Sequence, residues 1–250
     1  MISVCIPTFN GEAFIEEQVR SILAQLDIND EIVISDDNST DSTISKINSI
    51  GDKRIKIFQN YRSKRDDQRD TLYKVSLNVQ NALKNAKGDY IYLSDQDDIW
   101  IEGRIENTIE CLKANEPRLV VCNCKIIDEQ KKIIADSYFK YIKPSSSFFR
   151  TLFKSSFHGC CMSFNRKLVE KAFPFPFESL GHDLWIGLTA ILYGKIEFTD
   201  KPLIHYRRHS ATVTTTGFKS GASLSFKVSY RIRTIKAILR KIFKRVNENN

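Results

Sequence analysis

The sequence of 250 residues lacks the features that mark several large classes of protein. No stretch comes near the roughly 20 consecutive apolar residues of a membrane-spanning helix. The first residues show no basic region followed by an apolar one, as a signal peptide would. Internal repeats are absent, and so are low-complexity tracts other than a charged C-terminal tail. With 42% hydrophobic residues, the chain is expected to fold as a cytoplasmic globular protein.

Two further absences concern cysteine and glycine. The six cysteines include no Cys-x-x-Cys pair, and Cys160 and Cys161 are adjacent, so the sequence predicts small, buried, reduced thiols. Residues 7–14 contain one glycine and no lysine. This composition argues against a Gly-rich phosphate loop and against nucleotidyl transfer that makes a sugar nucleotide.

The charge is concentrated at one end of the chain. Lys and Arg number 38 against 30 Asp and Glu, a net charge of +8. Residues 219–250 hold nine basic residues and one acidic residue, so this tail accounts for the whole excess. The neutral remainder weakens any interpretation of the whole protein as a nucleic-acid binder, and no nucleic acid is expected as a partner.

The first hundred residues alternate between buried-strand and helical patterns. Apolar runs predict strands over residues 2–7, 31–35, 55–59 and 89–94, and helical spacing predicts helices over 14–26, 44–50 and 75–86. This alternation predicts an α/β fold with a mostly parallel central sheet and helices on both faces. Ligands of such sheets bind at the carboxyl ends of the strands.

The second half of the chain is less regular. Its patterns predict a helix over residues 102–115, a strand over 119–128, a helix over 166–172 and a buried helix over 183–193.

Polar clusters directly follow three of the predicted strands. Asp95, Asp97 and Asp98 come after residues 89–94, Asp36 and Asp37 after 31–35, and the third cluster includes Asn10. Clustered carboxylates suit Mg²⁺ or Mn²⁺ shared with substrate phosphates. The alternative is a set of acidic turns and helix caps on the surface.

The order and spacing of these motifs resemble family 2 glycosyltransferases with the GT-A fold. The resemblance covers roughly residues 1–215 and includes Pro-Thr-Phe-Asn-Gly-Glu at 7–12, Asp-Asp-Asn-Ser-Thr-Asp at 36–41 and Asp-Gln-Asp-Asp at 95–98. It implies that the nucleotide-sugar pocket is lined by Pro7, Thr8, Asn10, Glu12, Asp36, Asp37, Asn78, Asp95, Gln96 and Arg207. It implies Mn²⁺ or Mg²⁺ held by Asp97, Asp95 and His209, with Asp97 as the direct ligand. It implies that the acceptor or donor sugar is positioned by Asp98, Trp100, His182 and Trp185.

Asp183 is the catalytic base that the resemblance implies, because residues 181–185 match a later Glu-Asp or His-Asp motif of the family. An inverting transfer needs a carboxylate there to take the proton of the acceptor hydroxyl. A helix cap is the alternative interpretation of an isolated His-Asp pair.

Residues 205–210 read His-Tyr-Arg-Arg-His-Ser and resemble a segment that closes over the donor diphosphate. Arginine can bridge diphosphate oxygens with two parallel hydrogen bonds. A surface strand that places His205, Arg207 and His209 on one face is the alternative.

The basic tail shows apolar residues at helical spacing: Ile235, Ile238, Leu239, Ile242 and Val246. This pattern predicts a basic amphipathic helix on an anionic membrane surface, or else a helix packed on the catalytic domain. The expected organisation is a catalytic domain over residues 1–218, with a nucleotide-binding half at 1–100 and an acceptor-binding half at 101–218, followed by a membrane-associating tail at 219–250.

The sequence therefore predicts a metal-dependent inverting hexosyltransferase, peripheral on the inner face of a bacterial plasma membrane. Its expected donor is UDP-glucose or UDP-galactose, and its expected acceptor is a saccharide on a polyisoprenyl diphosphate, in O-antigen or capsule synthesis. A dTDP-rhamnose-dependent rhamnosyltransferase is one alternative. A non-catalytic protein that binds membrane or nucleic acid through the basic tail is another.

Overall fold

The structure is a computed structural model that describes residues 1–178, 180–209 and 223–248, with side chains as far as residue 243. The expected boundary between catalytic domain and tail, at residues 218 and 219, lies outside the described residues.

Nine strands form one mixed sheet in the order β3-β2-β1-β4-β8-β6-β9-β5, with β7 paired to β6. Strands β1 to β4 run parallel, as do β6 and β9, whereas β8 is antiparallel to both β4 and β6. The strands are β1 Ile2–Thr8, β2 Glu31–Asp36, β3 Ile55–Gln59, β4 Tyr90–Leu93, β5 Ile99–Trp100, β6 Arg118–Ile127, β7 Ile133–Ala135, β8 Met162–Asn165 and β9 Lys195–Arg207. The expected α/β fold is confirmed, and β8 joins the two halves of the chain into one sheet.

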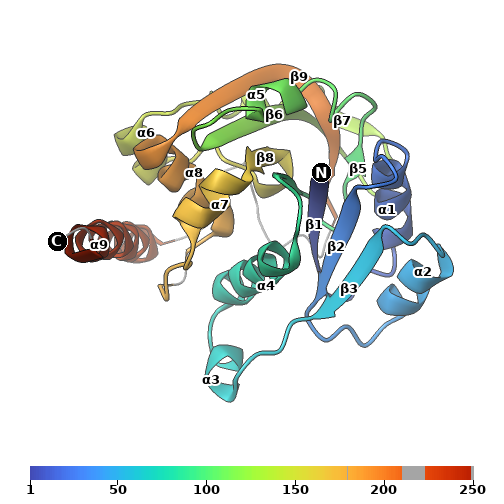
Figure 1. Ribbon diagram of the computed structural model, residues 1–250, viewed down its shortest axis with the longest axis horizontal. Helices are drawn as coiled ribbons and strands as arrows, with labels where there is room; N and C mark the ends of the chain where they lie inside the picture. The colour runs from blue at the N-terminus through green and yellow to red at the C-terminus, as the bar shows by residue number, and fades with distance from the viewer. Residues whose placement is uncertain (179, 210–222, 249–250) are drawn as a thin grey trace.

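Helices cover both faces of the sheet (Figure 1). Helices α1 and α2 lie on one side, and α4, α7 and α8 lie on the other, with α9 at the outer edge of that side. The helices are α1 Ile15–Leu23, α2 Thr43–Ser49, α3 Lys64–Asp67, α4 Thr71–Asn85, α5 Ile109–Leu112, α6 Phe148–Phe153, α7 Arg166–Ala172, α8 His182–Tyr193 and α9 Leu224–Glu248, with short 3-10 turns at Tyr138–Lys140 and Gly159–Cys161.

Alternating side chains of the central strands supply two separate cores. In β1, Val4 and Ile6 pack with the helices α1 and α2, whereas Cys5 packs on the opposite face with α4. In β2, Ile32 and Ile34 belong to the first core and Val33 to the second. Successive residues of a strand point to opposite faces, which explains why these strands read as continuous apolar runs.

The helix expected over residues 102–115 is wrong for most of its length, since only Ile109–Leu112 is helical. Gly103 has a φ of +82°, which interrupts a right-handed helix. Beside it, the buried guanidinium of Arg104 donates to the carbonyls of Leu93 and Cys160 over 3.0 and 2.6 Å. These long-range bonds hold the segment as turns against the sheet.

All six cysteines carry free thiols, and five of them are buried, as the sequence predicts. Within the described part of the chain, no helix is long and apolar enough to span a bilayer.

Candidate active site

The loops that follow β1, β2 and β4 meet at the carboxyl end of the sheet. Thr8 and Asp36 are register partners at the ends of β1 and β2, and the backbone nitrogen of Ser94, just after β4, donates to the carbonyl of Cys5. The polar clusters expected from the sequence therefore lie on adjacent loops.

Asp36 shapes the loop after β2 from within. Its carboxylate accepts hydrogen bonds from Ser39 Oγ over 2.6 Å, from the Ser39 backbone nitrogen over 3.0 Å and from Thr8 Oγ1 over 3.2 Å. Asn10, with a φ of +48°, accepts from the Thr40 nitrogen through Oδ1 over 2.9 Å. These bonds fix the two loops relative to each other.

Asp37 faces two side chains that sequence reasoning missed. Its Oδ1 accepts from Asn60 Nδ2 over 2.9 Å and forms an ion pair with Arg62. Arg62 also pairs with Asp67 over 2.8 Å. The nearly buried carboxylate of Asp37 is thus oriented by an amide and a guanidinium.

Glu12 and Asn78 hold elements together near this edge. Glu12 Oε2 accepts from the backbone nitrogen of Ser42 over 2.9 Å, at the start of α2. Asn78 Oδ1 accepts from Ser35 Oγ over 2.6 Å, and its Nδ2 donates to the Thr8 carbonyl over 3.2 Å. In this arrangement both residues support the loops, while Pro7 lies half-buried in β1.

Gln96 ties the acidic segment to the loop after β1. Its side-chain amide accepts from the Phe9 nitrogen over 2.9 Å and donates to the Phe9 carbonyl over 3.1 Å, as a neighbouring strand would. A Cβ at Gly11 would lie 2.5 Å from Gln96 Oε1, so glycine leaves the space that this amide occupies.

The three carboxylates of the acidic segment have different environments. Burial raises the pKa of Asp95 to about 7, and the charges of Asp97 and then Asp183 act in the same direction. Asp98 is 1% exposed, and its Oδ1 accepts from the Arg207 nitrogen over 3.0 Å. Burial raises the pKa of Asp98 well above its usual value, and Asp97 and Asp95 add to the effect.

Asp97 pairs with His209, over 2.7 Å between Oδ2 and Nε2. This bond raises the pKa of the His209 imidazole. The ring of Phe14 packs against His209 with 5.0 Å between the ring centres. The segment after β9 is thereby held against the acidic segment.

Arg207 is occupied by protein groups. Its side chain is 1% exposed and donates to Asp97 O, Glu129 O and Glu17 Oε2 over 2.8, 3.1 and 2.8 Å. The guanidinium also lies 4.7 Å from the centre of the Phe14 ring. A group so enclosed cannot reach a diphosphate in this conformation, so this arrangement makes Arg207 a positioning residue for the acidic segment.

Helix α8 begins at the same site. Gly181 precedes it, Asp183 lies in its first turn, and Asp183 Oδ1 accepts from the Leu184 nitrogen over 2.7 Å. Asp183 is close enough to Asp95 to raise the pKa of that carboxyl. Burial lowers the pKa of His182, which favours a neutral imidazole there.

Trp100 and Trp185 are core residues in this structure. The indole of Trp100 donates to Ser94 Oγ over 3.1 Å and stacks on Arg104, whose guanidinium is 4.1 Å from the ring centre. The indole of Trp185 donates to the Ala172 carbonyl over 2.8 Å. The contact with a sugar that the resemblance implies is not one that this packing provides, because both side chains are buried.

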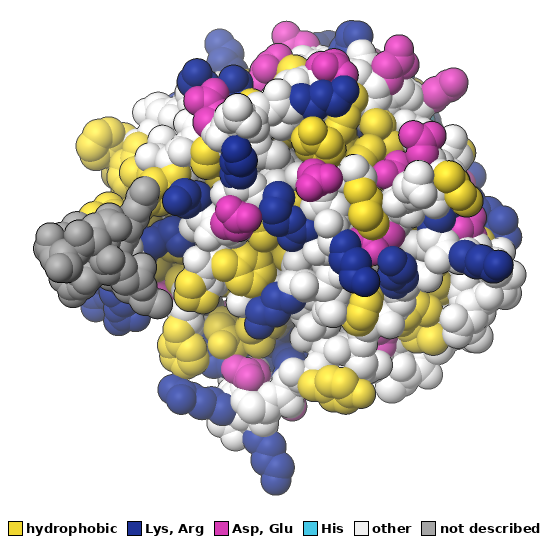
Figure 2. Space-filling view, in the orientation of Figure 1, with side chains coloured by type: hydrophobic (Ala, Val, Ile, Leu, Met, Phe, Trp, Pro, Cys, Tyr) yellow, Lys and Arg dark blue, Asp and Glu magenta, His cyan; other side chains and the backbone are white. Residues whose placement is uncertain are grey.

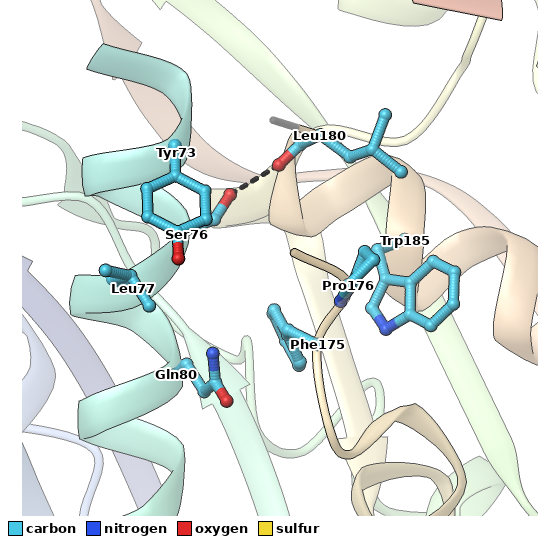
Figure 3. A pocket seen from close by; sticks show the side chains of 8 residues that line it. All are labelled: Tyr73, Ser76, Leu77, Gln80, Phe175, Pro176, Leu180 and Trp185. Atoms are coloured by element: carbon cyan, nitrogen blue, oxygen red, sulfur yellow. Dashed lines mark hydrogen bonds between the residues drawn. The ribbon is translucent and has the colours of Figure 1, made fainter. Parts of the chain in front are cut away.

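A small cavity lies beside Trp185. Residues of α4 and of the segment before α8 close around this cavity, where Ser76 Oγ donates to the Leu180 carbonyl over 2.6 Å (Figure 3). This hydrogen bond ties the segment just before α8 to α4.

His158 is a site residue that sequence reasoning missed. It is 5% exposed, stacks on Tyr138 with 5.3 Å between ring centres and meets the edge of Tyr206 at 4.5 Å. His158 is close enough to Asp95 to act electrostatically on the pKa of that carboxyl, which places it near the acidic segment. Its Nε2 and the Tyr138 hydroxyl are buried without a hydrogen-bond partner among the described residues. No spacing signal marked this histidine; only its position before the Gly159–Cys161 turn distinguishes it.

The site fits a divalent cation by its donor chemistry. Single ligand atoms of Asp95, Asp98 and Cys160 lie within 4.8 Å of one another. The buried Oδ2 of Asp98 has no nitrogen or oxygen donor among the described residues. Burial first, and neighbouring carboxylates second, raise the pKa values of Asp95 and Asp98, and a bound cation would offset both effects. Oxygen ligands suit Mg²⁺ and Mn²⁺, whereas a thiol does not.

Curated relatives share most of this chain. It is 27% identical over 222 residues to the Escherichia coli UDP-Glc:alpha-D-GlcNAc-diphosphoundecaprenol beta-1,3-glucosyltransferase WfgD, which covers 88% of this chain and 81% of the relative. It is 29% identical over 235 residues to the Shigella flexneri dTDP-rhamnosyl transferase RfbG, covering 90% and 76% of the two chains.

A solved structure supports the fold. Glucosyl-3-phosphoglycerate synthase from Mycobacterium tuberculosis, in complex with Mn²⁺, UDP and glucosyl-3-phosphoglycerate, matches with a TM-score of 0.56 and 18% identity, over 96% of this chain and 79% of that one. The family model for glycosyl transferase family 2 matches residues 3–173. With its mixed α/β sheet and acidic segment at the end of β4, the chain belongs to glycosyl transferase family 2 and is a glycosyltransferase of the GT-A fold.

Proposed function

We propose that this protein transfers a hexose from a nucleotide sugar to a lipid-linked saccharide, with inversion at the anomeric carbon. The observation that carries the proposal is the position of Asp183, in the first turn of α8 and within electrostatic reach of Asp95. A carboxylate there takes the proton of the acceptor hydroxyl as that oxygen attacks the anomeric carbon. The leaving nucleoside diphosphate departs on the opposite side.

The first role of the loops is to hold the nucleotide. Asp37, oriented by Asn60 and Arg62, offers a carboxylate oxygen to the edge of a base, and the Thr8 and Asn10 loop lies beside it. The UDP-glucose named in the description of WfgD supports a uridine nucleotide as the first donor to test. The dTDP-rhamnosyl transferase RfbG supports a second candidate, dTDP-rhamnose.

Asp97, Asp95 and His209 would hold Mn²⁺ or Mg²⁺, and single ligand oxygens of Asp95 and Asp98 lie within 4.8 Å of each other. A bound cation supplies charge neutralisation for the departing diphosphate. The protein's own contribution is to fix these groups: Arg207 holds the backbone of the acidic segment, and Asp98 accepts from the nitrogen of Arg207. The manganese in the synthase structure supports this choice of ion.

The acceptor that we propose is a saccharide on a polyisoprenyl diphosphate, in the assembly of a bacterial surface polysaccharide such as O-antigen or capsule. The diphosphoundecaprenol acceptor named for WfgD supports this class. The protein would then work at the inner face of the plasma membrane, as a peripheral protein on an anionic lipid surface. The basic residues of the tail support that location.

Thermal unfolding with a panel of nucleotides tests the proposal. UDP, UDP-glucose, UDP-galactose, dTDP and dTDP-rhamnose are each added with and without Mn²⁺. A ligand at 100 times its dissociation constant stabilises the folded protein by about 2.7 kcal/mol. Metal-dependent stabilisation by uridine compounds supports the first donor, selectivity for thymidine compounds supports the second, and no stabilisation by any nucleotide contradicts the proposal.

A further inference from the structure

Helix α9 has two apolar faces rather than one. Thr234, Ala237 and Ile238 are buried against the domain, and the Tyr230 hydroxyl accepts from the Gly181 nitrogen. A second set of apolar residues is exposed, with exposed fractions from 37 to 76%: Leu224, Val228, Ile232, Ile235, Leu239 and Ile242. We call this set the outer stripe. Its steps of three and four residues place all its members on one side of the helix.

The two faces resolve the choice that the sequence left open. The helix packs on the domain, as the second alternative expects, and it also presents an exposed apolar surface, as the first expects. Ile238, which the sequence groups with Ile235 and Leu239, turns inward and is 5% exposed. The outer stripe is therefore not needed for packing within the described chain.

Helix α6 extends the apolar surface. Its Phe149 and Phe153 are 73% and 65% exposed. Arg231 of α9 donates to the Phe153 carbonyl over 3.1 Å, and its guanidinium lies 5.0 Å from the centre of the Phe153 ring. Arg231 follows Val228 by three residues and precedes Ile235 by four, so α6 meets the border of the outer stripe. Figure 2 shows apolar side chains gathered on the left of the molecule, where Figure 1 places α6.

Cationic side chains border this surface. Residues 224–243 contain six Lys and Arg and no Asp or Glu. Arg231 borders the outer stripe on the side of α6, and Lys236, one turn from Ile232 and Leu239, borders it on the other side. An apolar stripe flanked by cations matches a bilayer surface, where apolar side chains enter the boundary of the acyl chains and cations meet lipid phosphates.

We propose that α6 and α9 together form a bilayer-docking face for anionic lipid, made of the outer stripe, Phe149 and Phe153. The proposal rests on the proposed function in one respect, since a lipid-linked acceptor requires an enzyme at the membrane. The charge favours anionic lipid over a second copy of this chain as the partner of this face. A second copy would place its own six cations next to the six of residues 224–243. Phe149 and Phe153 of α6 add apolar area outside α9, and pairing of α9 with another helix would not require that area.

Vesicle binding of the full chain tests the proposal. Co-sedimentation is measured with phosphatidylcholine vesicles, with and without phosphatidylglycerol, for the wild type, Phe149→Ser/Phe153→Ser and Ile232→Ser/Ile235→Ser. All four positions are exposed, so the variants retain the core. Each pair of substitutions should weaken binding to phosphatidylglycerol vesicles by about tenfold or more. The reason is that each pair removes two apolar side chains that would enter the bilayer. Ile28 lies in the loop after α1 and is 85% exposed. The Ile28→Ser variant is therefore the matched control, and it should bind vesicles as the wild type does.

Three results would overturn the docking face. Wild-type binding by the Phe149→Ser/Phe153→Ser variant would show that α6 does not contact the bilayer. Equal binding to vesicles with and without phosphatidylglycerol would show that anionic lipid is not required. A dimer in sedimentation equilibrium that Ile232→Ser/Ile235→Ser converts to monomer, with unchanged vesicle binding, would assign the stripe to a second copy.

A separate measurement tests the proposed function. Transfer from UDP-glucose or dTDP-rhamnose to a short, soluble acceptor analogue is measured for the same variants. Normal transfer together with lost vesicle binding supports both proposals. Absence of transfer in the wild type, with vesicle binding as expected, contradicts the proposed function and leaves the docking face standing.

Discussion

The hydroxyl of Tyr230 in α9 accepts a hydrogen bond from the backbone nitrogen of Gly181, the residue that precedes α8, over 3.1 Å. Two residues after Gly181 comes Asp183. Arg240 of the same helix pairs with Glu178 over 2.5 Å, and Lys241 lies 5.2 Å from the ring centre of Trp185. The C-terminal helix thus holds the entry to the helix that carries the proposed base.

Replacing Tyr230 with phenylalanine should lower kcat several-fold and leave the affinity for UDP unchanged. The substitution removes the acceptor of the Gly181 nitrogen, which costs about 1 kcal/mol and loosens the first turn of α8. Steady-state kinetics and calorimetric UDP binding measure the two effects. Ser229→Ala, an exposed substitution next to it in α9, is the control. Wild-type kcat in Tyr230→Phe would remove the link between α9 and the base.

Asp183→Asn should reduce transfer by about 100-fold or more, because an amide cannot accept the proton of the acceptor hydroxyl. Nucleotide binding should stay close to that of the wild type, since Asp183 contributes no contact to the loops after β1 and β2 among those described. Asp200→Asn, an exposed carboxylate in β9, provides a matched change of charge. Near-normal turnover in Asp183→Asn would show that another group is the base.

The metal ligands can be distinguished by three single substitutions. Asp97→Asn should abolish the Mn²⁺-dependent part of stabilisation by UDP, and His209→Ala should weaken it. Cys160→Ser should leave it unchanged, because a thiol is a poor ligand for Mn²⁺ or Mg²⁺ although it lies with Asp95 and Asp98. Unfolding temperatures with UDP, with and without Mn²⁺, measure the effect. If only Cys160→Ser loses the Mn²⁺-dependent stabilisation, the cation binds at the cluster of Asp95, Asp98 and Cys160 instead.

Arg207→Met should lower the free energy of unfolding by about 2–4 kcal/mol. The change removes the buried guanidinium that donates to Asp97, Glu129 and Glu17, and these part-buried acceptors lose three hydrogen bonds. Urea unfolding measures the loss, and Arg20→Met, at an exposed ion pair with Glu16, should cost less than about 1 kcal/mol. Equal costs at the two positions would contradict the positioning role of Arg207.

Glu31 should make stability depend on pH. Burial alone would raise the pKa of this carboxyl, but bonds from Lys56, the Lys87 nitrogen and Ser3 together lower it below the usual value of 4.5. Its stabilisation is therefore complete above pH 4.5 and is lost as the pH falls through the lower folded pKa. Urea unfolding of the wild type and Glu31→Gln should show a difference at neutral pH that shrinks under acid conditions. A difference independent of pH would contradict this account.

The strands of the first half could be predicted because their apolar runs are bounded by polar loops. Residues 55–59 form β3 as expected, and the strand expected over residues 2–7 is one residue longer. The turns after β5 could not be predicted, because the bonds of Arg104 to Leu93 and Cys160 connect parts of the chain far apart in sequence. Helical spacing near residue 105 gives no sign of them.

The candidate site shows the same division. The sequence pattern located the acidic segment and the start of α8, since both depend on local spacing. Whether Arg207 faces a ligand or Glu17, and whether Trp185 faces a sugar or the core, depends on packing between distant elements. His158 escaped notice for that reason, because its neighbours Tyr138 and Tyr206 come from other segments.

The pairing of Gln96 with the backbone of Phe9 has a consequence for protein engineering. The amide fits only where residue 11 has no side chain in its way, so the first loop and the acidic segment are matched parts. A chimera that takes the first loop from one relative and the acidic segment from another would combine surfaces that were never selected together. Donor preference is therefore best exchanged by grafting both segments at once, as a single cassette.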